Sequence, residues 1–270
     1  MPRVLARLAV PPMLAAVAWA TALAAAAPAA ATAVGYVALG DSYATGVGTR
    51  SYDYDSSGCQ RSRLAYPVLD AARLGAPLSF AACHGATVSS VLSGQLGTLN
   101  AETGYVTIMV GGNDAGFSAV IAQCARPWPY RCTNNINGAN NYIRNILPGT
   151  LDTLYTQVRT RAPNARVVVV GYPRLFNGEQ CNLLSRISPA EQSALNATAD
   201  LLDTTIAGRA AAHGFGFADA RGAYNHHAIC DDAEWLNGLS NPTSESYHPN
   251  RQGQAGYADV VAAVLVGAAA

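Results

Sequence analysis

Five short, almost uninterrupted runs of apolar residues limit the folds open to this chain more than any other feature. They are Tyr36–Leu39, Leu78–Ala82, Tyr105–Val110, Arg166–Gly171 and Phe215–Ala218. Because these runs do not alternate with polar residues, they predict strands buried on both faces, as in a parallel sheet.

Helical patterns separate the apolar runs. Tyr66–Leu74 is the first, Asn140–Arg161 carries apolar residues at steps of three and four, and Gln252–Val266 is the last. A capping box with proline at the first helical position, Ser188-Pro189-Ala190-Glu191, predicts a helix to about Ala212. Strands that alternate with helices predict a three-layer α/β/α sandwich around about five parallel strands.

The N-terminus has the pattern of a secretory signal. Arg3 and Arg7 precede a long Ala/Leu/Val run that ends in the small residues Ala31-Thr32-Ala33. The alternative is an N-terminal membrane anchor, but the small-residue site and the strand that follows favour cleavage. We therefore expect a signal peptide over 1–33, one domain over 34–270, an extracellular protein and no stable membrane insertion after cleavage.

Charge and cysteine usage narrow the function classes. The formal net charge is zero and there is no basic run, so nothing recommends a nucleic-acid partner. All six cysteines follow the predicted signal and none forms C-x-x-C, so zinc-site spacing is missing. In an exported chain an even count predicts three disulfides, although the residues alone do not choose the pairing. The cysteines are Cys59, Cys83, Cys124, Cys132, Cys181 and Cys230.

Polar residues stand directly after three of the predicted strands and before the last helix. The first strand is followed by Asp41-Ser42, the second by His84-Gly85 and the third by Gly112-Asn113-Asp114, while Glu245 and His248 precede the last helix. The carboxyl ends of parallel strands meet at one edge, where such sheets bind ligands. A hydroxyl, an imidazole, a carboxylate and amide donors at one edge are the groups that acyl transfer requires.

Ser42 and the Asn113 segment also have purely structural interpretations. Ser42 stands where a helix N-cap is expected, and Gly-Gly-Asn-Asp is a common turn sequence. The convergence of all the segments favours chemistry over capping and turns.

These segments resemble a known family. Gly40-Asp41-Ser42, Gly85, Gly112-Asn113-Asp114 and His248-Pro249 are similar, in order, to the four blocks of the SGNH (GDSL-type) hydrolases. The stretches ALGDSYATGVG and VGGNDAGF, with the cysteines, resemble secreted actinomycete lipases and esterases of the Streptomyces type. The resemblance implies a flavodoxin-like SGNH hydrolase fold and a secreted serine esterase or lipase.

The resemblance also implies roles for individual residues. Ser42 would attack the ester carbonyl and form an acyl-enzyme, and His248 would act as its base. Glu245 would orient His248, although the family usually has Asp there; a backbone carbonyl near a Trp is the alternative, and Trp235 precedes this loop. The backbone N–H groups of Ser42 and Gly85 and the side-chain amide of Asn113 would form the oxyanion hole. The implied disulfides are sequential: Cys59–Cys83, Cys124–Cys132 and Cys181–Cys230.

We therefore expect hydrolysis of carboxylic, fatty acyl esters by a monomer that needs no metal or organic cofactor. Its partner would be a small-molecule or lipid ester. A carbohydrate acetylesterase or a phospholipase is the alternative within the same chemistry. A non-catalytic extracellular binding protein is the alternative from another class, but no essential group is missing.

Overall fold

The structure is a computed structural model that describes residues 34–53, 57–127, 129–181 and 187–267, besides Met1. The described residues from Val34 onward belong to one compact unit. Apart from Met1, the predicted signal segment 1–33 lies outside the described residues.

A single sheet of five parallel strands forms the centre of this unit, which confirms the predicted fold class. The strand order is β2-β1-β3-β4-β5. Tyr36 pairs with Tyr105 and Val106 pairs with Val167, so the central strands run in register. The strands are β1 (Gly35–Gly40), β2 (Leu78–Phe80), β3 (Thr103–Met109), β4 (Arg166–Val170) and β5 (Gly216–Ala218).

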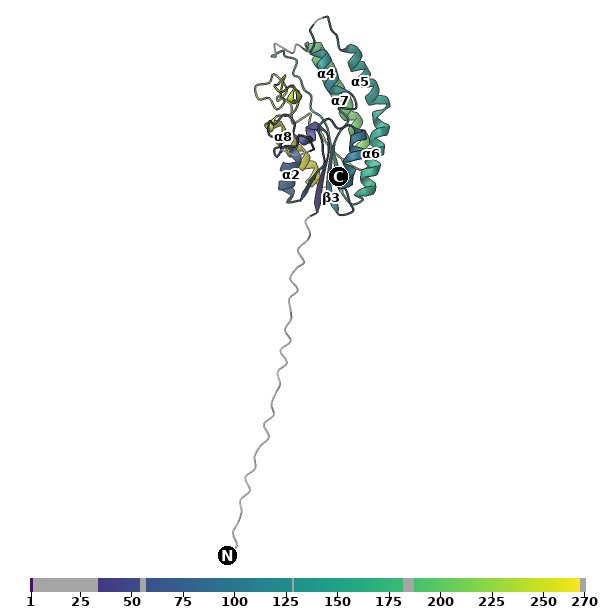
Figure 1. The fold of residues 1–270 in the computed structure, drawn as a ribbon, viewed down its shortest axis with the longest axis vertical. Coiled ribbons are helices and arrows are strands. Elements are labelled where there is room, and N and C mark those ends of the chain that lie inside the picture. Colours follow the sequence, from purple (N-terminus) through teal and green to yellow (C-terminus); the bar gives the residue numbers. More distant parts are fainter. Residues whose placement is uncertain (2–33, 54–56, 128, 182–186, 268–270) are drawn as a thin grey trace. The chain divides into compact units, whose positions relative to one another are not determined.

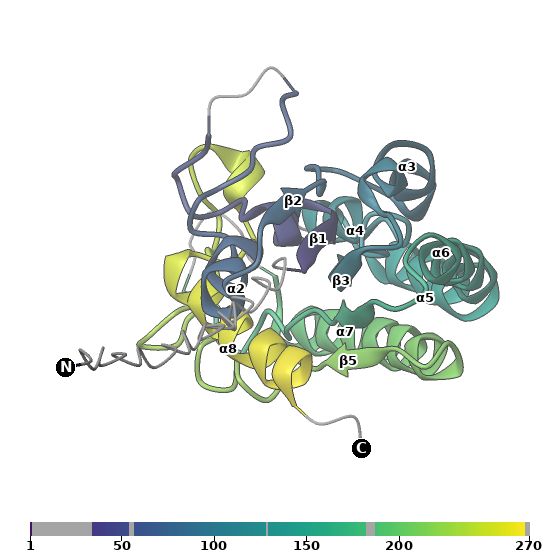
Figure 2. The ribbon, with the colours of Figure 1, turned by 90° about the horizontal axis from the view of Figure 1, so that it is seen from below.

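Helices cover both faces of the sheet (Figures 1 and 2). α2 (Tyr66–Leu74) and α8 (Arg251–Val266) form one outer layer, and α3 (Val88–Gly94) to α7 (Pro189–Ala212) form the other. The second layer also contains α4 (Phe117–Cys124), α5 (Thr133–Asn145) and α6 (Leu147–Arg161). The short elements are α1 (Ser42–Thr45) and the 3₁₀ turns η1 (Leu96–Thr98) and η2 (Thr243–Glu245). This two-sided cover explains why β4 reads as one valine run, because its side chains are buried on both faces.

The capping box of α7 forms as predicted. The Ser188 hydroxyl accepts from the Glu191 backbone N–H, and the Glu191 side chain accepts from the Ser188 backbone N–H. Two otherwise unpaired donors at the helix start are thereby satisfied.

One helix prediction is wrong. The pattern over 140–161 belongs to two helices, α5 and α6, which meet at Ile146. Pro148 lacks the N–H that a continuous helix would need at this position, but it is tolerated in the first turn of a helix, so α6 starts here. Ile146, part of the apolar pattern, is 48% exposed at this break, whereas Leu147 and Leu151 are buried.

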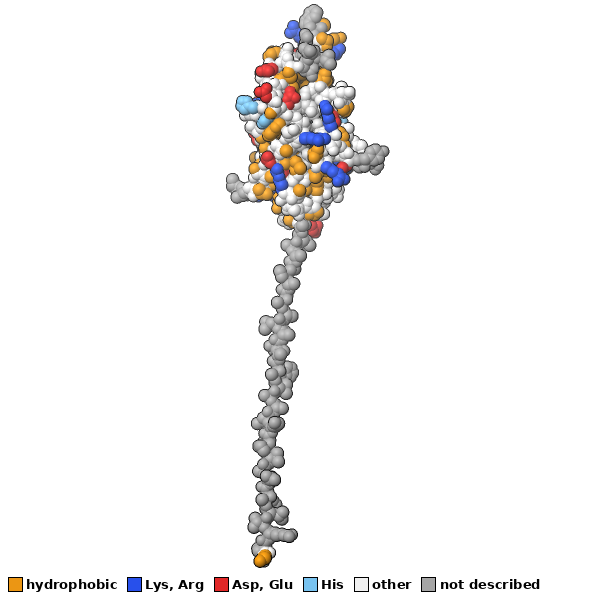
Figure 3. All heavy atoms as spheres, turned by 90° about the vertical axis from the view of Figure 1, so that its left-hand side faces the viewer, with side chains coloured by type: hydrophobic (Ala, Val, Ile, Leu, Met, Phe, Trp, Pro, Cys, Tyr) orange, Lys and Arg blue, Asp and Glu red, His pale blue; other side chains and the backbone are white. Residues whose placement is uncertain are grey.

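The exposed surface carries both signs of charge. On the face shown in Figure 3, arginine and acidic side chains are interspersed. That face presents no continuous basic surface for a polyanion, in keeping with the zero formal net charge.

Candidate active site

Ser42 stands where β1 ends, as the first residue of α1. Gly40 has a φ of 142°, and a Cβ there would lie 2.3 Å from the Met109 carbonyl oxygen, so only glycine lets β1 pass β3 this closely. Asp41 then caps α1, because its side chain accepts from the Tyr43 backbone N–H at 3.0 Å. The tight turn leaves Ser42 almost buried, at the edge of a cavity.

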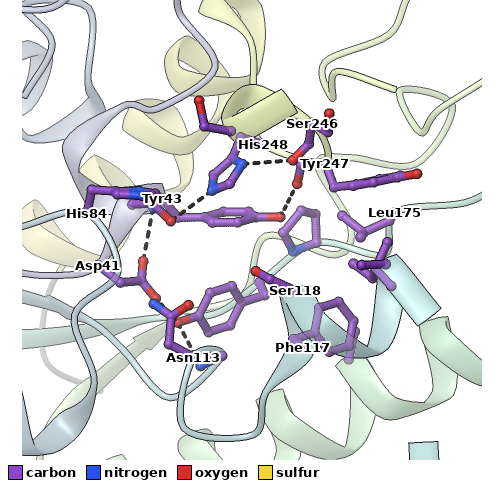
Figure 4. A pocket seen from close by; sticks show the side chains of 18 of the residues that line it. Asp41, Tyr43, His84, Asn113, Phe117, Ser118, Leu175, Ser246, Tyr247 and His248 are labelled. Atoms are coloured by element: carbon purple, nitrogen blue, oxygen red, sulfur yellow. Dashed lines mark hydrogen bonds between the residues drawn. The ribbon is translucent and has the colours of Figure 1, made fainter. Parts of the chain in front are cut away.

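His248 meets Ser42 from the other end of the chain. Its Nε2 lies 2.8 Å from the Ser42 Oγ (Figure 4), and the residue is 9% exposed. The two residues are 206 positions apart, so the fold alone brings them together.

The imidazole is oriented by a backbone carbonyl. His248 Nδ1 lies 2.9 Å from the Ser246 carbonyl oxygen. Because a carbonyl only accepts, Nδ1 carries the hydrogen and Nε2 is free to accept from the serine hydroxyl. This is the tautomer that a general base for Ser42 needs.

Glu245 does not orient His248, so that expectation is corrected. Its carboxylate accepts from the Tyr52 hydroxyl at 2.6 Å and pairs with Arg50 Nε at 3.3 Å. The backbone explains the difference: η2 ends at Glu245, and Tyr247 then takes a left-handed φ of 63°. The Ser246 carbonyl therefore faces the ring, while the Glu245 side chain is held by the 50–52 segment.

The Trp235 carbonyl is not the orienting group either. It accepts from the Asn250 backbone N–H at 2.9 Å, and the indole stacks on His227 with ring centroids 4.0 Å apart. The alternative of a backbone carbonyl thus applies, but the carbonyl belongs to Ser246.

The three expected oxyanion donors lie on the turns after β1, β2 and β3. In the described part of the chain, the backbone N–H groups of Ser42 and Gly85 have no hydrogen-bond partner. Gly85 has a φ of 75°, and a Cβ there would meet no atom within 4 Å. Asn113 lines the cavity, and its Nδ2 donates one hydrogen to the Ala86 carbonyl at 3.0 Å, which leaves the second free.

Burial governs the protonation of the site. Desolvation lowers the pKa of His248 to about 4, the Ser246 carbonyl opposes this shift, and the nearby His84 adds to it. Desolvation also raises the pKa of Asp41 to about 7, against the hydrogen bonds from Tyr172 and Tyr43. At neutral pH His248 is therefore uncharged and able to accept a proton.

A cavity of about 560 Å³ opens beside these groups. Figure 4 shows His84 and His248 toward one end and Phe117 and Leu175 toward the other. The apolar end is supplied by α4, α7 and the loops after β4 and before α8. Its lining comprises Phe117, Ile121, Ala122, Ala125, Pro173, Leu175, Ala199, Leu202, Leu239 and Tyr247. We name this end the apolar chamber.

Three disulfides join Cys59 to Cys83, Cys124 to Cys132 and Cys181 to Cys230. These are the pairs that the family resemblance implies. The first adjoins the site, because His84 follows Cys83 and donates its backbone N–H to the Cys59 carbonyl at 3.1 Å. It therefore fixes the segment that carries Gly85.

No group of three or more His, Cys, Asp or Glu suited to a metal ion occurs among the described residues. In the same part of the chain, no helix combines the length and apolar character needed to span a bilayer.

Tyr172, which was not among the predicted site residues, lines the cavity and contacts two of the active-site turns. A signal for it existed. Tyr172 comes two residues after β4, so the strand-end rule that located Ser42 and Asn113 also applies to it. The residues of α4 gave no such signal, because no helix was predicted there.

Comparison with known proteins agrees with this geometry. The model of the GDSL-like Lipase/Acylhydrolase family matches residues 38–255. Lipase 1 of Streptomyces coelicolor is 45% identical over 245 residues, which is 90% of each chain. Lipase of Streptomyces rimosus is 43% identical over 232 residues, covering 85% of this chain and 86% of that protein.

Solved structures give the same result. An extracellular lipase from Streptomyces rimosus has a TM-score of 0.80 at 42% identity, and a phospholipase A1 from Streptomyces albidoflavus has 0.81 at 43%. Each alignment covers 85% of this chain and 98% of the other. The family model and these relatives match most of the chain, and the fold agrees with them. The chain therefore belongs to the GDSL-like lipase/acylhydrolase family and is a carboxylic ester hydrolase.

Proposed function

We propose that the protein is a secreted serine lipase or esterase that cleaves fatty acyl esters through an acyl-enzyme. The observation that carries this proposal is the 2.8 Å contact between Ser42 Oγ and a buried, uncharged His248 beside the apolar chamber. The site thus combines a serine hydroxyl, a base in the tautomer that can activate it, and room for an acyl chain.

In the proposed reaction, His248 Nε2 takes the proton of the Ser42 hydroxyl as Oγ attacks the ester carbonyl. The Ser246 carbonyl accepts from Nδ1 and favours the imidazolium that forms. The backbone N–H groups of Ser42 and Gly85 and the Asn113 amide donate to the oxyanion. His248 then protonates the leaving alcohol, and the same steps with water release the acid.

The apolar chamber supports fatty acyl esters over acetyl esters. A cavity of about 560 Å³ is much larger than an acetyl group, and its far end carries mostly apolar side chains. Burying each methylene of an acyl chain contributes about 0.8 kcal/mol, so such a lining rewards longer chains. An acetyl group would leave most of this apolar lining uncovered.

Phospholipid hydrolysis is the second candidate. It is favoured by the 43% identity to a protein described as a phospholipase A1, whose alignment covers 98% of that chain. The same apolar chamber would hold the acyl chain of either substrate, so the chamber does not separate the two.

Secretion is supported by the signal pattern of residues 1–33 and by the relative described as extracellular. N-terminal sequencing of the protein in culture medium tests it. We expect a mature chain that starts at Val34, and an intact Met1 on a membrane-bound form would contradict cleavage.

The chemistry is tested with p-nitrophenyl esters of graded acyl length, together with phosphatidylcholine and a triacylglycerol. We expect wild-type turnover to be greatest above acetate and Ser42→Ala to abolish it. An organophosphate ester should label Ser42 in the wild type and should not label a His248→Ala variant. Full activity of Ser42→Ala would refute the nucleophile, and an optimum at acetate would favour the acetylesterase.

A further inference from the structure

Tyr172 connects the turn that holds Ser42 to the turn that holds Asn113. Its hydroxyl donates to Asp41 Oδ2 at 2.6 Å and accepts from the Gly112 backbone N–H at 3.2 Å. The residue is 7% exposed, and it belongs to neither turn, since it follows β4. One buried hydroxyl therefore ties together the segments after β1 and β3.

The partners of this hydroxyl are next to the groups that would react. Asp41 caps α1 and so fixes the Ser42 hydroxyl and backbone N–H. Gly112 directly precedes Asn113, whose amide also bonds the Ala86 carbonyl beside Gly85. The distance between the nucleophile and the side-chain oxyanion donor thus depends on the Tyr172 hydroxyl.

Close packing keeps this arrangement in place. A Cβ on Gly112 would lie 3.3 Å from Tyr172 Cζ and 3.4 Å from its hydroxyl, so the turn approaches the phenol ring closely. The Tyr43 ring packs edge-on against the Tyr172 ring, with centroids 5.3 Å apart. These contacts leave the hydroxyl little freedom to move away from Asp41.

Tyr172 is itself anchored to a different layer. Its backbone N–H donates to Oδ1 of Asp203, a buried residue of α7, at 2.8 Å. Arg221 Nε lies 3.6 Å from the other oxygen of that carboxylate. Tyr172 is therefore held at its backbone by α7 as well as at its hydroxyl by the two turns.

We propose that Tyr172 is a positioning residue for ester hydrolysis, whose hydroxyl holds the Ser42 and Asn113 turns at their reactive separation. This inference rests on the proposed roles of Ser42 and Asn113. A misplacement of about 1 Å between reacting groups can reduce a rate about 100-fold. Loss of the hydroxyl should therefore lower kcat more than it changes KM.

Tyr172→Phe tests the proposal, with Tyr36→Phe as its matched control. Tyr36 is also fully buried, and Tyr36→Phe removes one hydroxyl hydrogen bond, to Thr107 inside the sheet. Tyr36 does not line the cavity. We expect Tyr172→Phe to lower kcat about 10- to 100-fold with KM within about threefold. The rate of Ser42 labelling by an organophosphate ester should fall in parallel, while Tyr36→Phe keeps kcat within about twofold.

A double-mutant cycle with Asp41→Asn provides a second readout, which compares the losses in the two single variants with the loss in the double variant. If Tyr172 acts through Asp41, the double variant should be about as slow as the slower single variant. Multiplicative losses would overturn the proposal, as would a kcat loss in Tyr172→Phe no larger than in Tyr36→Phe, or a loss confined to KM. Activity that survives in Ser42→Ala would instead refute the proposed function itself, so the two failures are distinguishable.

Discussion

The carbonyl oxygen of Ser246 lies 2.9 Å from Nδ1 of His248 and fixes the tautomer of the imidazole. A neutral carbonyl does this without adding a charge to a buried site. The left-handed backbone of Tyr247 directs the carbonyl at the ring, and the Tyr43 hydroxyl donates to the Tyr247 carbonyl at 2.6 Å. The orientation of the base is therefore a property of the loop backbone.

Glu245→Gln should remain an active enzyme. Glu245 does not contact His248, and a glutamine at this position can still accept from Tyr52. We expect kcat on p-nitrophenyl butyrate to fall less than about tenfold, whereas loss of a triad carboxylate costs about 10⁴-fold in other enzymes. A loss beyond about 100-fold with normal thermal stability would show that Glu245 carries the charge that stabilises the imidazolium.

The acid limb of kcat/KM should lie well below pH 6.5. His248 must be neutral to act as a base, and burial lowers its pKa to about 4, so activity is lost only as pH falls through that lower value. Chromatographic assay of the released alcohol between pH 3.5 and 9 measures the limb. Circular dichroism at each pH shows that the protein stays folded. A midpoint near 7 would contradict the lowered pKa of His248. Loss of that midpoint in Asp41→Asn would assign it to Asp41, whose pKa is raised to about 7, and its persistence would assign it to His248.

Removing the Cys59–Cys83 disulfide should lower both stability and turnover. The bond fixes the segment before Gly85, so the oxyanion donor there would be held less firmly. We expect the Cys59→Ser/Cys83→Ser variant to lose about tenfold in kcat and about 2–5 kcal/mol of stability.

The Cys181→Ser/Cys230→Ser variant is the control for that prediction. Its loop is longer, with a sequence separation of 49 against 24, so its stability loss should be at least as large. Its kcat should change less, because neither cysteine is close in sequence to Ser42, Gly85, Asn113 or His248, whereas Cys83 comes two residues before Gly85. Equal kcat losses in the two variants would show a general effect of lower stability.

Filling the apolar chamber should shift the acyl preference to shorter chains. Ala199 on α7 lines the cavity, and a leucine there would occupy the space of several acyl carbons. For Ala199→Leu we expect kcat/KM for a decanoate ester to fall about tenfold or more relative to a butyrate ester. Ala197→Leu, at an exposed position of the same helix, should keep the wild-type ratio. An unchanged ratio in both variants would place the acyl chain elsewhere.

The parts of this molecule that depend on local pattern could be predicted from its sequence. The apolar runs give β1 and β4 because burial on both faces leaves no place for polar residues. Ser42 and Asn113 could be found because strand ends of a parallel sheet converge. Glu245 was assigned wrongly because its side-chain direction depends on the φ of Tyr247 and on partners nearly 200 positions away. The apolar chamber was not predictable, since it requires residues of α4, α7 and two loops to meet around one cavity.

α2 carries a buried carboxyl away from the active site. Asp70 on α2 is fully buried, and one of its oxygens lies 3.5 Å from Arg73 Nη1. Desolvation raises the pKa of Asp70 to about 7, Arg73 opposes this and Asp259 adds to it. Protonation of Asp70 therefore stabilises the folded state relative to the unfolded chain.

The sign of its effect on stability follows from proton linkage. With an ordinary pKa of 3.8 in the unfolded chain and about 7 in the folded one, the native state binds more protons between these values. The contribution of Asp70 to stability is thus greatest below pH 3.8 and is lost as pH rises through 7.

Asp70→Asn removes this titration. The melting temperature of the variant minus that of the wild type should therefore be larger at pH 9 than at pH 5. We expect the corresponding gain in unfolding free energy to be about 1–3 kcal/mol. Asp53→Asn, which alters an exposed ion pair with Arg63, should show no such trend. Thermal melts of the three proteins at both pH values measure the effect. The same difference from wild type at pH 5 and pH 9 would mean that Asp70 is already ionised in the folded protein at pH 5.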